Sequence, residues 1–462
     1  MVNNMDTKEL FFKHEKLHNE YAKDKSVDIF IEHLKLIKEF NNNNVKHILK
    51  SDNELDEKTN DSMDLVSALK EAWNPDVLFK EMKSFFNTDI KNISTLEMAV
   101  PSTKRGLFLN SLNQTEKQFD LISIKNFSYD GDKEKSPIYN SFEIGRKKSG
   151  NFLVDGYKFF KKDDTLMMLH TEPAFGGVII LTAFAVDENI VSKFCNDVKK
   201  HMEENNFLKN EKISLSGKFI DRTTKDWDDV VLLDDVSESL EQLEKFFEFI
   251  KNEDFSQRGF IFAGPPGTGK TLSANILAEK IKGSFIWISE KDFIEEGYPR
   301  YTINQAFELA KELSPSVLFF EDVDSILLGN IDIFKTQLDG LEKHSGLMVI
   351  LCTNYPDRFP DELLNRPGRF DEIVLFDLPD ADARKKLIKI YLKGVIEDSD
   401  LDEIAEKTNK FSGAHIQELG RQAHIISKLK DKKIDKSVIL EAIGRMLKQD
   451  ALINSIRKSK ES

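Results

Sequence analysis

The sequence contains little cysteine and no long apolar segment. Only two of its 462 residues are cysteine, Cys195 and Cys352, and they stand far apart. A disulfide framework or a zinc ribbon is therefore excluded in practice. The most apolar run, residues 176–186, is about half as long as the ~20-residue helix that spans a membrane. No apolar signal segment follows the polar start of the chain, so we expect a cytoplasmic protein without a membrane partner.

Basic residues are also in short supply. Lysine and arginine total 66 against 80 aspartate and glutamate residues, which gives a formal net charge of −14. We therefore expect no nucleic-acid partner held on a global basic surface, although a local basic pore is compatible with this charge. With 40% hydrophobic and 32% charged residues, the composition is typical of a globular protein. The length is about three times that of a ~150-residue domain and predicts two to four domains.

The first half of the chain carries no catalytic pattern. Residues 1–90 form a predicted helical N-terminal region, because apolar residues recur near the 3.6-residue period around 29–37 and 63–86. Residues 91–222 contain short β-branched and aromatic runs, which predict an α+β domain with a hairpin turn at 161–164. We expect this half to bind a client or partner protein.

The second half changes to a different pattern. Apolar runs alternate with helical segments, which is typical of a parallel sheet with βαβ crossovers. We expect an α/β subdomain over residues 223–380 and a helical subdomain over residues 381–462. The strand-like runs lie at 259–263, 285–288, 317–320, 347–352 and 373–376.

A phosphate-binding loop is the strongest motif. Residues 264–271 fit GxxxxGK[ST], follow a predicted strand and open a predicted helix at Leu272. Glycines let successive backbone N–H groups converge on phosphate oxygens, and the helix N-terminus adds partial positive charge. Lys270 is expected at the β- and γ-phosphates, and Thr271 on Mg²⁺. The predicted nucleotide-binding residues of this segment are Pro266, Gly267, Thr268, Gly269, Lys270, Thr271 and Leu272.

Three further polar groups follow the phosphate loop. Glu321 and Asp322 come directly after an apolar strand, where a Mg²⁺ ligand and a water-activating base belong. Asn354 follows another strand and can hold the attacking water. Arg366 and Arg369 stand one short turn apart, and guanidinium groups stabilise charge on a transferring phosphoryl group. Lys270, Glu321, Asp322, Asn354, Arg366 and Arg369 are therefore the candidate catalytic residues.

Taken together, the elements from about Asp226 to Leu447 resemble the AAA family of ATPases. The resemblance implies an α/β P-loop module with flanking helices and a C-terminal helical lid, with ATP and Mg²⁺ as cofactors. It also implies a homo-oligomeric ring, usually a hexamer, that remodels a protein client. Asp229 and Val231 match the segment that cradles adenine, and Tyr391 falls near the base.

The resemblance extends to a water-holding residue, two arginines and the lid. Asn354 matches the polar sensor residue of the family, and Arg366 and Arg369 match arginines that reach the neighbouring subunit's nucleotide. Gly413 and Ala414, followed by His415, resemble the Gly-Ala-Asp element of the lid.

Two departures from the family pattern leave alternatives open. The usual acidic order is Asp-Glu, whereas Glu321 precedes Asp322 here, so either residue can be the base and either can face the metal. This order is similar to the meiotic-clade branch that includes the mitochondrial complex III assembly ATPase. At the first pore loop Glu295 replaces the usual aromatic residue, with Phe293 or Tyr298 as substitutes. The alternatives to a client remodeller are a nucleotide-gated scaffold with slow hydrolysis and, less favoured, a nucleic-acid motor.

Overall fold

The computed structural model of the chain describes residues 76–461, apart from gaps at 129–132, 175–176, 251–258, 297, 341–345, 365–369 and 393–395. The helices predicted within residues 1–75 lie outside these described residues. The chain divides into two compact units. The first holds the residues up to Phe207 together with Glu296–Tyr301, and the second holds Leu208–Glu295 and Thr302–Ser462. Each unit is described by itself below.

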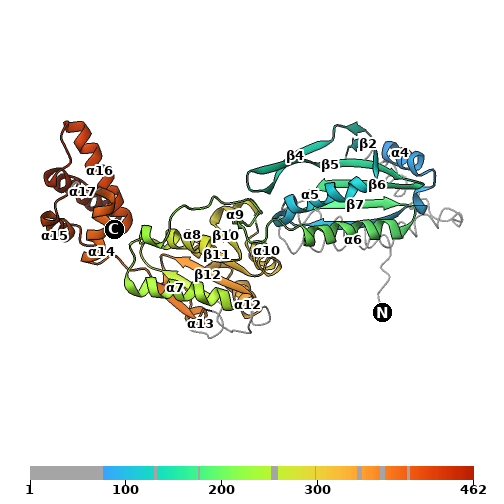
Figure 1. Cartoon of the computed structure of the whole chain (residues 1–462). Helices are drawn as coiled ribbons and strands as arrows, with labels where there is room; N and C mark the ends of the chain where they lie inside the picture. Colours follow the sequence, from blue (N-terminus) through green and yellow to red (C-terminus); the bar gives the residue numbers. More distant parts are fainter. Residues whose placement is uncertain are drawn as a thin grey trace. The chain divides into compact units, whose positions relative to one another are not determined.

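The first unit is built on an antiparallel sheet (Figure 1). The strand order is β1-β7-β6-β5-β2-β3, and β4 pairs with β5. The bounds are β1 Ser94–Val100, β2 Asp120–Phe127, β3 Glu134–Lys135, β4 Ile138–Gly145, β5 Lys148–Lys162, β6 Thr165–Pro173 and β7 Ile179–Ala185. The predicted hairpin turn is confirmed, because Asp163 takes a left-handed φ of 51° between β5 and β6.

Helices cover both faces of this sheet. They are α4 Asp76–Phe86, α5 Arg105–Thr115 and α6 Glu188–Glu204. Leucines and phenylalanines of α5 and α6 pack with alternate strand residues such as Leu169 and Leu181 on one face. Met82 and Phe86 of α4 pack with Phe159 and Met168 on the other. Alternation of period two in the strands therefore supplies two separate cores.

The second unit contains a parallel sheet of order β13-β9-β12-β11-β10-β8. The strands are β8 Lys212–Ser214, β9 Gly259–Ala263, β10 Ser284–Ile288, β11 Ser316–Glu321, β12 Leu347–Thr353 and β13 Glu372–Leu375. Five of them match predicted runs. β8 lies in sequence within the predicted 91–222 domain, yet it pairs with β10. Its three residues are too few to show a period.

Helices flank this sheet on both faces (Figure 1). They are α7 Asp234–Phe249, α8 Lys270–Lys280, α9 Glu290–Glu296, α10 Pro299–Glu312, α11 Asp324–Gly329, α12 Ile331–Asp339 and α13 Asp361–Leu364. Side chains of α7 and α8 pack with strand residues such as Phe262 and Phe319. Phe307 of α10 and Phe334 of α12 pack on Phe320 on the other face. Strands buried on both faces explain the near-continuous apolar runs of the sequence.

Four helices follow the sheet and share one apolar core. They are α14 Ala381–Leu392, α15 Asp398–Lys407, α16 Gly413–Lys430 and α17 Lys436–Glu461. The predicted fold class, a parallel sheet with flanking helices and a helical lid preceded by an α+β domain, is therefore confirmed. Across the described ranges, none of the helices combines the length and the apolar character required to span a bilayer.

Candidate active site

The phosphate loop lies between the end of β9 and the start of α8. Gly264 and Gly267 have φ values of 143° and 78°, which side-chain-bearing residues rarely adopt. A Cβ atom on Gly264 would lie 2.1 Å from the carbonyl oxygen of Phe376. On Gly267 it would lie 2.7 Å from the Cβ of Ala414 in the lid. Glycine is therefore required here by backbone conformation and by close packing.

Lys270 occupies the first turn of α8. Its Nζ donates hydrogen bonds to the carbonyl oxygens of Gly264, at 2.6 Å, and Pro265, at 2.8 Å. The residue is 5% exposed, and burial lowers the pKa of its amine, although Cys352 and Asp322 act in the opposite direction. The amine therefore lies at the centre of the loop, where a phosphate oxygen would be its natural additional partner.

The two adjacent carboxylates of β11 face different partners. Glu321 accepts a hydrogen bond from the hydroxyl of Thr271, with 2.6 Å between Oγ1 and Oε1. Asp322 has a left-handed φ of 50°, and its Oδ1 accepts a bond from Nδ2 of Asn354 at 3.0 Å. Glu321 therefore stands beside the phosphate loop, and Asp322 stands beside the polar residue at the end of β12.

Asn354 is held by the residues around it. The hydroxyl of Thr353 donates to Oδ2 of Asp324 at 2.7 Å and accepts from the backbone N–H of Tyr355 at 2.9 Å. Burial raises the pKa of Asp324, whereas the hydrogen bond from Thr353 lowers it. These contacts fix the backbone on both sides of Asn354, and they connect β12 to the residues that follow β11.

A cavity of about 300 Å³ brings these groups together. All twelve residues predicted to bind the nucleotide line it, and so do Asp322 and Asn354. The twelve are Asp229, Val231, Pro266, Gly267, Thr268, Gly269, Lys270, Thr271, Leu272, Tyr391, Gly413 and Ala414. Four lining residues were not among those predicted. Val230 lies between Asp229 and Val231 in the matched segment, whereas Cys352, Leu387 and Gln417 belong to no motif.

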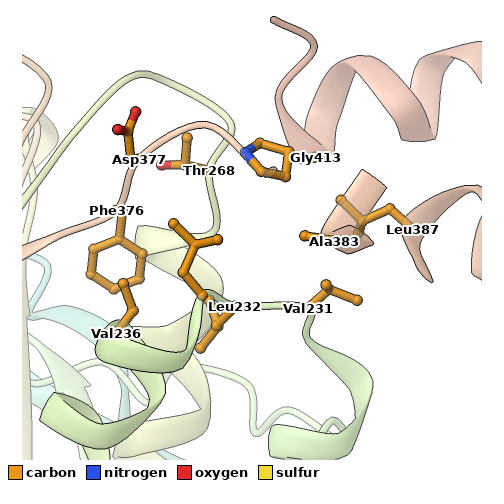
Figure 2. A pocket seen from close by; sticks show the side chains of 11 residues that line it. Val231, Leu232, Val236, Thr268, Phe376, Asp377, Ala383, Leu387 and Gly413 are labelled. Carbon is orange, nitrogen blue, oxygen red and sulfur yellow. The ribbon is translucent and has the colours of Figure 1, made fainter. Parts of the chain in front are cut away.

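A smaller apolar pocket adjoins this cavity and shares Val231, Thr268, Leu387 and Gly413 with it. Figure 2 shows the side chain of Val231 near Ala383 and Leu387 of α14, while Leu232 lies toward Phe376 and Val236. An apolar surface at the end of a phosphate site suits the flat face of a purine base.

The lid touches the phosphate loop through the start of α16. The backbone N–H of Ala414 donates to the carbonyl oxygen of Gly267 at 3.1 Å. Ser412 caps the helix, and Nδ1 of His415 lies 3.2 Å from the Ser412 backbone nitrogen, completing a capping box. His415 therefore caps the start of α16, at the position where the family resemblance predicts an aspartate.

The remaining predicted residues are not brought to the cavity by the described structure. Arg366 and Arg369 lie outside the described residues, as does the side chain of Glu295. Phe293, one proposed substitute for the pore aromatic, is 4% exposed in α9. Its ring is therefore buried and cannot serve as the pore-loop aromatic residue, whereas the neighbouring Ile294 is 73% exposed.

The site fits a Mg²⁺ ion bound together with a nucleotide. Thr271 and Glu321 offer a hydroxyl and a carboxylate oxygen only 2.6 Å apart, and Mg²⁺ is bound by one or two such ligands together with substrate phosphates. Among the residues that the structure describes, no group of three or more His, Cys, Asp or Glu side chains is placed to hold a metal. The phosphates would therefore complete the coordination.

Known proteins match this half of the chain. Residues 260–378 match the family model described as "ATPase family associated with various cellular activities (AAA)". The chain contains an AAA ATPase domain. An ATP-dependent zinc metalloprotease, FtsH 2 of Petrotoga mobilis, is 32% identical over 260 residues, which are 51% of this chain and 40% of the relative. FtsH of Kosmotoga olearia is 33% identical over 252 residues, 49% of this chain and 39% of the relative.

Solved structures were also matched. The FIGL-1 AAA domain in complex with ADP is 25% identical and has a TM-score of 0.41, with 48% of this chain and 84% of that chain covered. A katanin structure concerned with self-assembly is 27% identical with a TM-score of 0.38, covering 48% and 85%. This chain spans about two fifths of the length of these two metalloproteases.

The sequence prediction that the first half carries no catalytic pattern missed one motif in the N-terminal region. Residues 14–18 read His-Glu-Lys-Leu-His and fit the HExxH pattern of zinc-dependent proteases. Such a site also needs a helical context and a third ligand. Residues 14–18 lie outside the described residues, and no zinc site is assigned to them.

Proposed function

We propose that the protein hydrolyses ATP to ADP and phosphate with Mg²⁺ as cofactor. The observation that carries the proposal is the different placement of the two carboxylates, because Asp322 lines the nucleotide cavity whereas Glu321 bonds to a residue that lines it. Glu321 bonds to Thr271 of the phosphate loop, and Asp322 bonds to Asn354. The family of the domain supports the same activity, because AAA proteins are ATPases.

Each group has a distinct part in the proposed reaction. The loop N–H groups and Lys270 bind the phosphates. Thr271 and Glu321 would hold Mg²⁺, which would neutralise negative charge on the phosphates. Asn354 orients the attacking water, and Asp322 accepts its proton. The base is therefore the shorter carboxylate, whereas the longer Glu321 reaches toward the phosphate loop.

The test is Asp322→Asn. We expect turnover to fall about 10²- to 10⁴-fold, because a general base contributes that much, while the affinity for ATP stays within a few-fold. Asp402→Asn makes the same chemical change at a side chain that is 80% exposed on α15 and should leave both quantities unchanged. Full turnover by Asp322→Asn would refute the assignment.

At a finer level, we propose that the chain forms a hexameric ring and uses ATP to remodel a protein client. Support comes from Arg366 and Arg369, which match arginines that act on a neighbouring subunit's nucleotide, and from the separately folded first unit. The Glu321-Asp322 order favours the meiotic-clade branch. ATPase rate per protomer should rise as the oligomer forms with increasing concentration. A rate independent of oligomer mass would refute action across subunits.

A nucleotide-gated scaffold is the second candidate. It is favoured by the burial of Phe293, because a buried ring on α9 cannot contact a client protein as the usual pore-loop aromatic residue does. It predicts that Lys270→Ala abolishes ATP-dependent assembly, while Asp322→Asn preserves biological function. The remodeller predicts loss of function in both variants.

A further inference from the structure

We propose that Trp287, supported by Lys212, is a positioning residue that fixes the Glu321 carboxylate for Mg²⁺. This inference rests on the proposed function. Trp287 lies on β10, and its indole Nε1–H donates to Oε2 of Glu321 at 2.8 Å. The other oxygen of the same carboxylate, Oε1, is the one that meets Thr271. The two carboxylate oxygens are therefore held by different partners, one on the metal side and one behind it.

The indole itself is fixed by its surroundings. Trp287 is 9% exposed, and its ring packs on Phe319 with 4.5 Å between centroids and 61° between planes. The amine of Lys212 on β8 lies 5.0 Å from the ring centroid on Trp287, a cation–π distance. A ring held by a strand neighbour and by a cation has little freedom to move its N–H group away from Glu321.

Lys212 also connects the indole to the phosphate loop. Its Nζ donates to Oδ1 of Asn275 at 2.5 Å, and Nδ2 of Asn275 donates to the backbone carbonyl of Thr271 at 2.8 Å. Four hydrogen bonds and one cation–π contact therefore form a closed ring of residues: Thr271, Glu321, Trp287, Lys212 and Asn275. Both proposed Mg²⁺ ligands are supported from behind by the same set of residues.

The need for this support follows from the length of glutamate. Glu321 has one more rotatable bond than aspartate would have, so its carboxylate could occupy more positions. A second hydrogen bond removes that freedom before Mg²⁺ binds. Carboxylates that ligate metals are commonly hydrogen-bonded in turn, and loss of such a partner costs about 10- to 100-fold in metal affinity or activity.

The alternative is that the indole only satisfies its own N–H group, as buried tryptophans usually do. The two roles are separated by the magnesium dependence of nucleotide binding. In the full chain carrying Trp287→Phe, we expect binding of a fluorescent ADP analogue in EDTA to stay within about twofold of wild type. The Mg²⁺ concentration at half-maximal enhancement of that binding should rise about 10- to 100-fold. A purely structural tryptophan would lower thermal stability without changing the magnesium requirement.

Trp227 offers a matched control. Its indole also donates to a carboxylate, Oε1 of Glu244, at 2.9 Å, but Glu244 lies on α7, whereas Glu321 bonds to Thr271 of the phosphate loop. Trp227→Phe should leave the magnesium requirement unchanged. Lys212→Met should shift it in the same direction as Trp287→Phe by a smaller factor, and this variant keeps the test available if Trp287→Phe folds poorly.

A double-mutant cycle identifies Glu321 as the group through which Trp287 acts. Glu321→Asp shortens the side chain, so it cannot reach both partners, and Trp287→Phe should then have little added effect. A wild-type magnesium requirement in Trp287→Phe, or full additivity with Glu321→Asp, would overturn the inference. Wild-type protein that binds nucleotide without any magnesium effect would instead overturn the proposed function.

Discussion

The two units of the molecule both bury polar groups, but they use them differently. In the antiparallel sheet of the first unit, Lys158 and Glu116 form an ion pair of 2.5 Å whose side chains are 14% and 9% exposed. In the parallel sheet of the second unit, Glu321 ends β11, Asp322 and Asn354 follow β11 and β12, and Lys270 lies beyond the loop after β9. Of these residues, Lys270, Asp322 and Asn354 line a cavity.

This difference teaches that a buried charge by itself is poor evidence of a functional site. In the first unit, Lys158 bonds to one oxygen of Glu116, and the other oxygen is buried without a hydrogen-bond partner. In the second unit, Lys270, Asp322 and Asn354 line a common cavity beside a strained glycine loop. Three variants test this difference between the two units, and they are given in order of decreasing expected effect.

Gly267→Ala should weaken nucleotide binding about 10- to 100-fold, because a non-glycine residue at a φ of 78° is strained and its methyl group would collide with Ala414. Calorimetric titration with ADP measures the effect. The matched control is Gly444→Ala in α17, where nothing lies within 4 Å of the added atom. It should retain full affinity and raise stability by about 0.5–1 kcal/mol. Equal affinities would contradict the strain argument.

Lys158→Met should destabilise the first unit by about 3 kcal/mol, because it leaves Glu116 buried without its cation. Burial already raises the pKa of Glu116, against the lowering effect of Lys158. Chemical denaturation measures the loss. ATPase activity of the folded protein should be unchanged, and a large loss of turnover would show that the first-unit pair serves the site after all.

His170 predicts a smaller, pH-dependent effect. Burial lowers the pKa of His170 to about 4, with Asp155 raising it and Lys135 lowering it further, and its ring stacks on Tyr157 at 4.0 Å. The folded pKa is below the unfolded value, so the unfolded chain binds more protons between pH 6.5 and 4. Stability contributed by neutral His170 is therefore full above pH 6.5 and is lost as the pH falls toward 4.

The measurement compares wild type with His170→Gln. Across this pH window we expect wild type to lose up to about 3 kcal/mol more unfolding free energy than the variant. Glu172, whose pKa burial raises, acts in both proteins and cancels in the difference. Identical pH profiles would show that the pKa of His170 is the same in the folded and unfolded states.

Local sequence reasoning succeeded where a signal lies within a few consecutive residues. Residues 264–271 combine glycine, lysine and threonine at fixed spacing, and the predicted residues of this loop do line one cavity. The strands of the parallel sheet are also recognisable, because burial on both faces requires continuous apolar runs. By contrast, β8 is only three residues long, and its pairing with β10 depends on a strand far along the chain.

The amino-acid order alone therefore determined the class of the fold, the phosphate loop and the identity of the acidic and amide groups at the strand ends. Only the tertiary structure decided that Glu321 faces Thr271 while Asp322 faces Asn354, and that Trp287 stands behind Glu321. The physical reason is that neighbouring residues at a strand end diverge according to backbone dihedral angles. Their partners come from other strands and helices, and chain folding alone brings those within hydrogen-bonding distance.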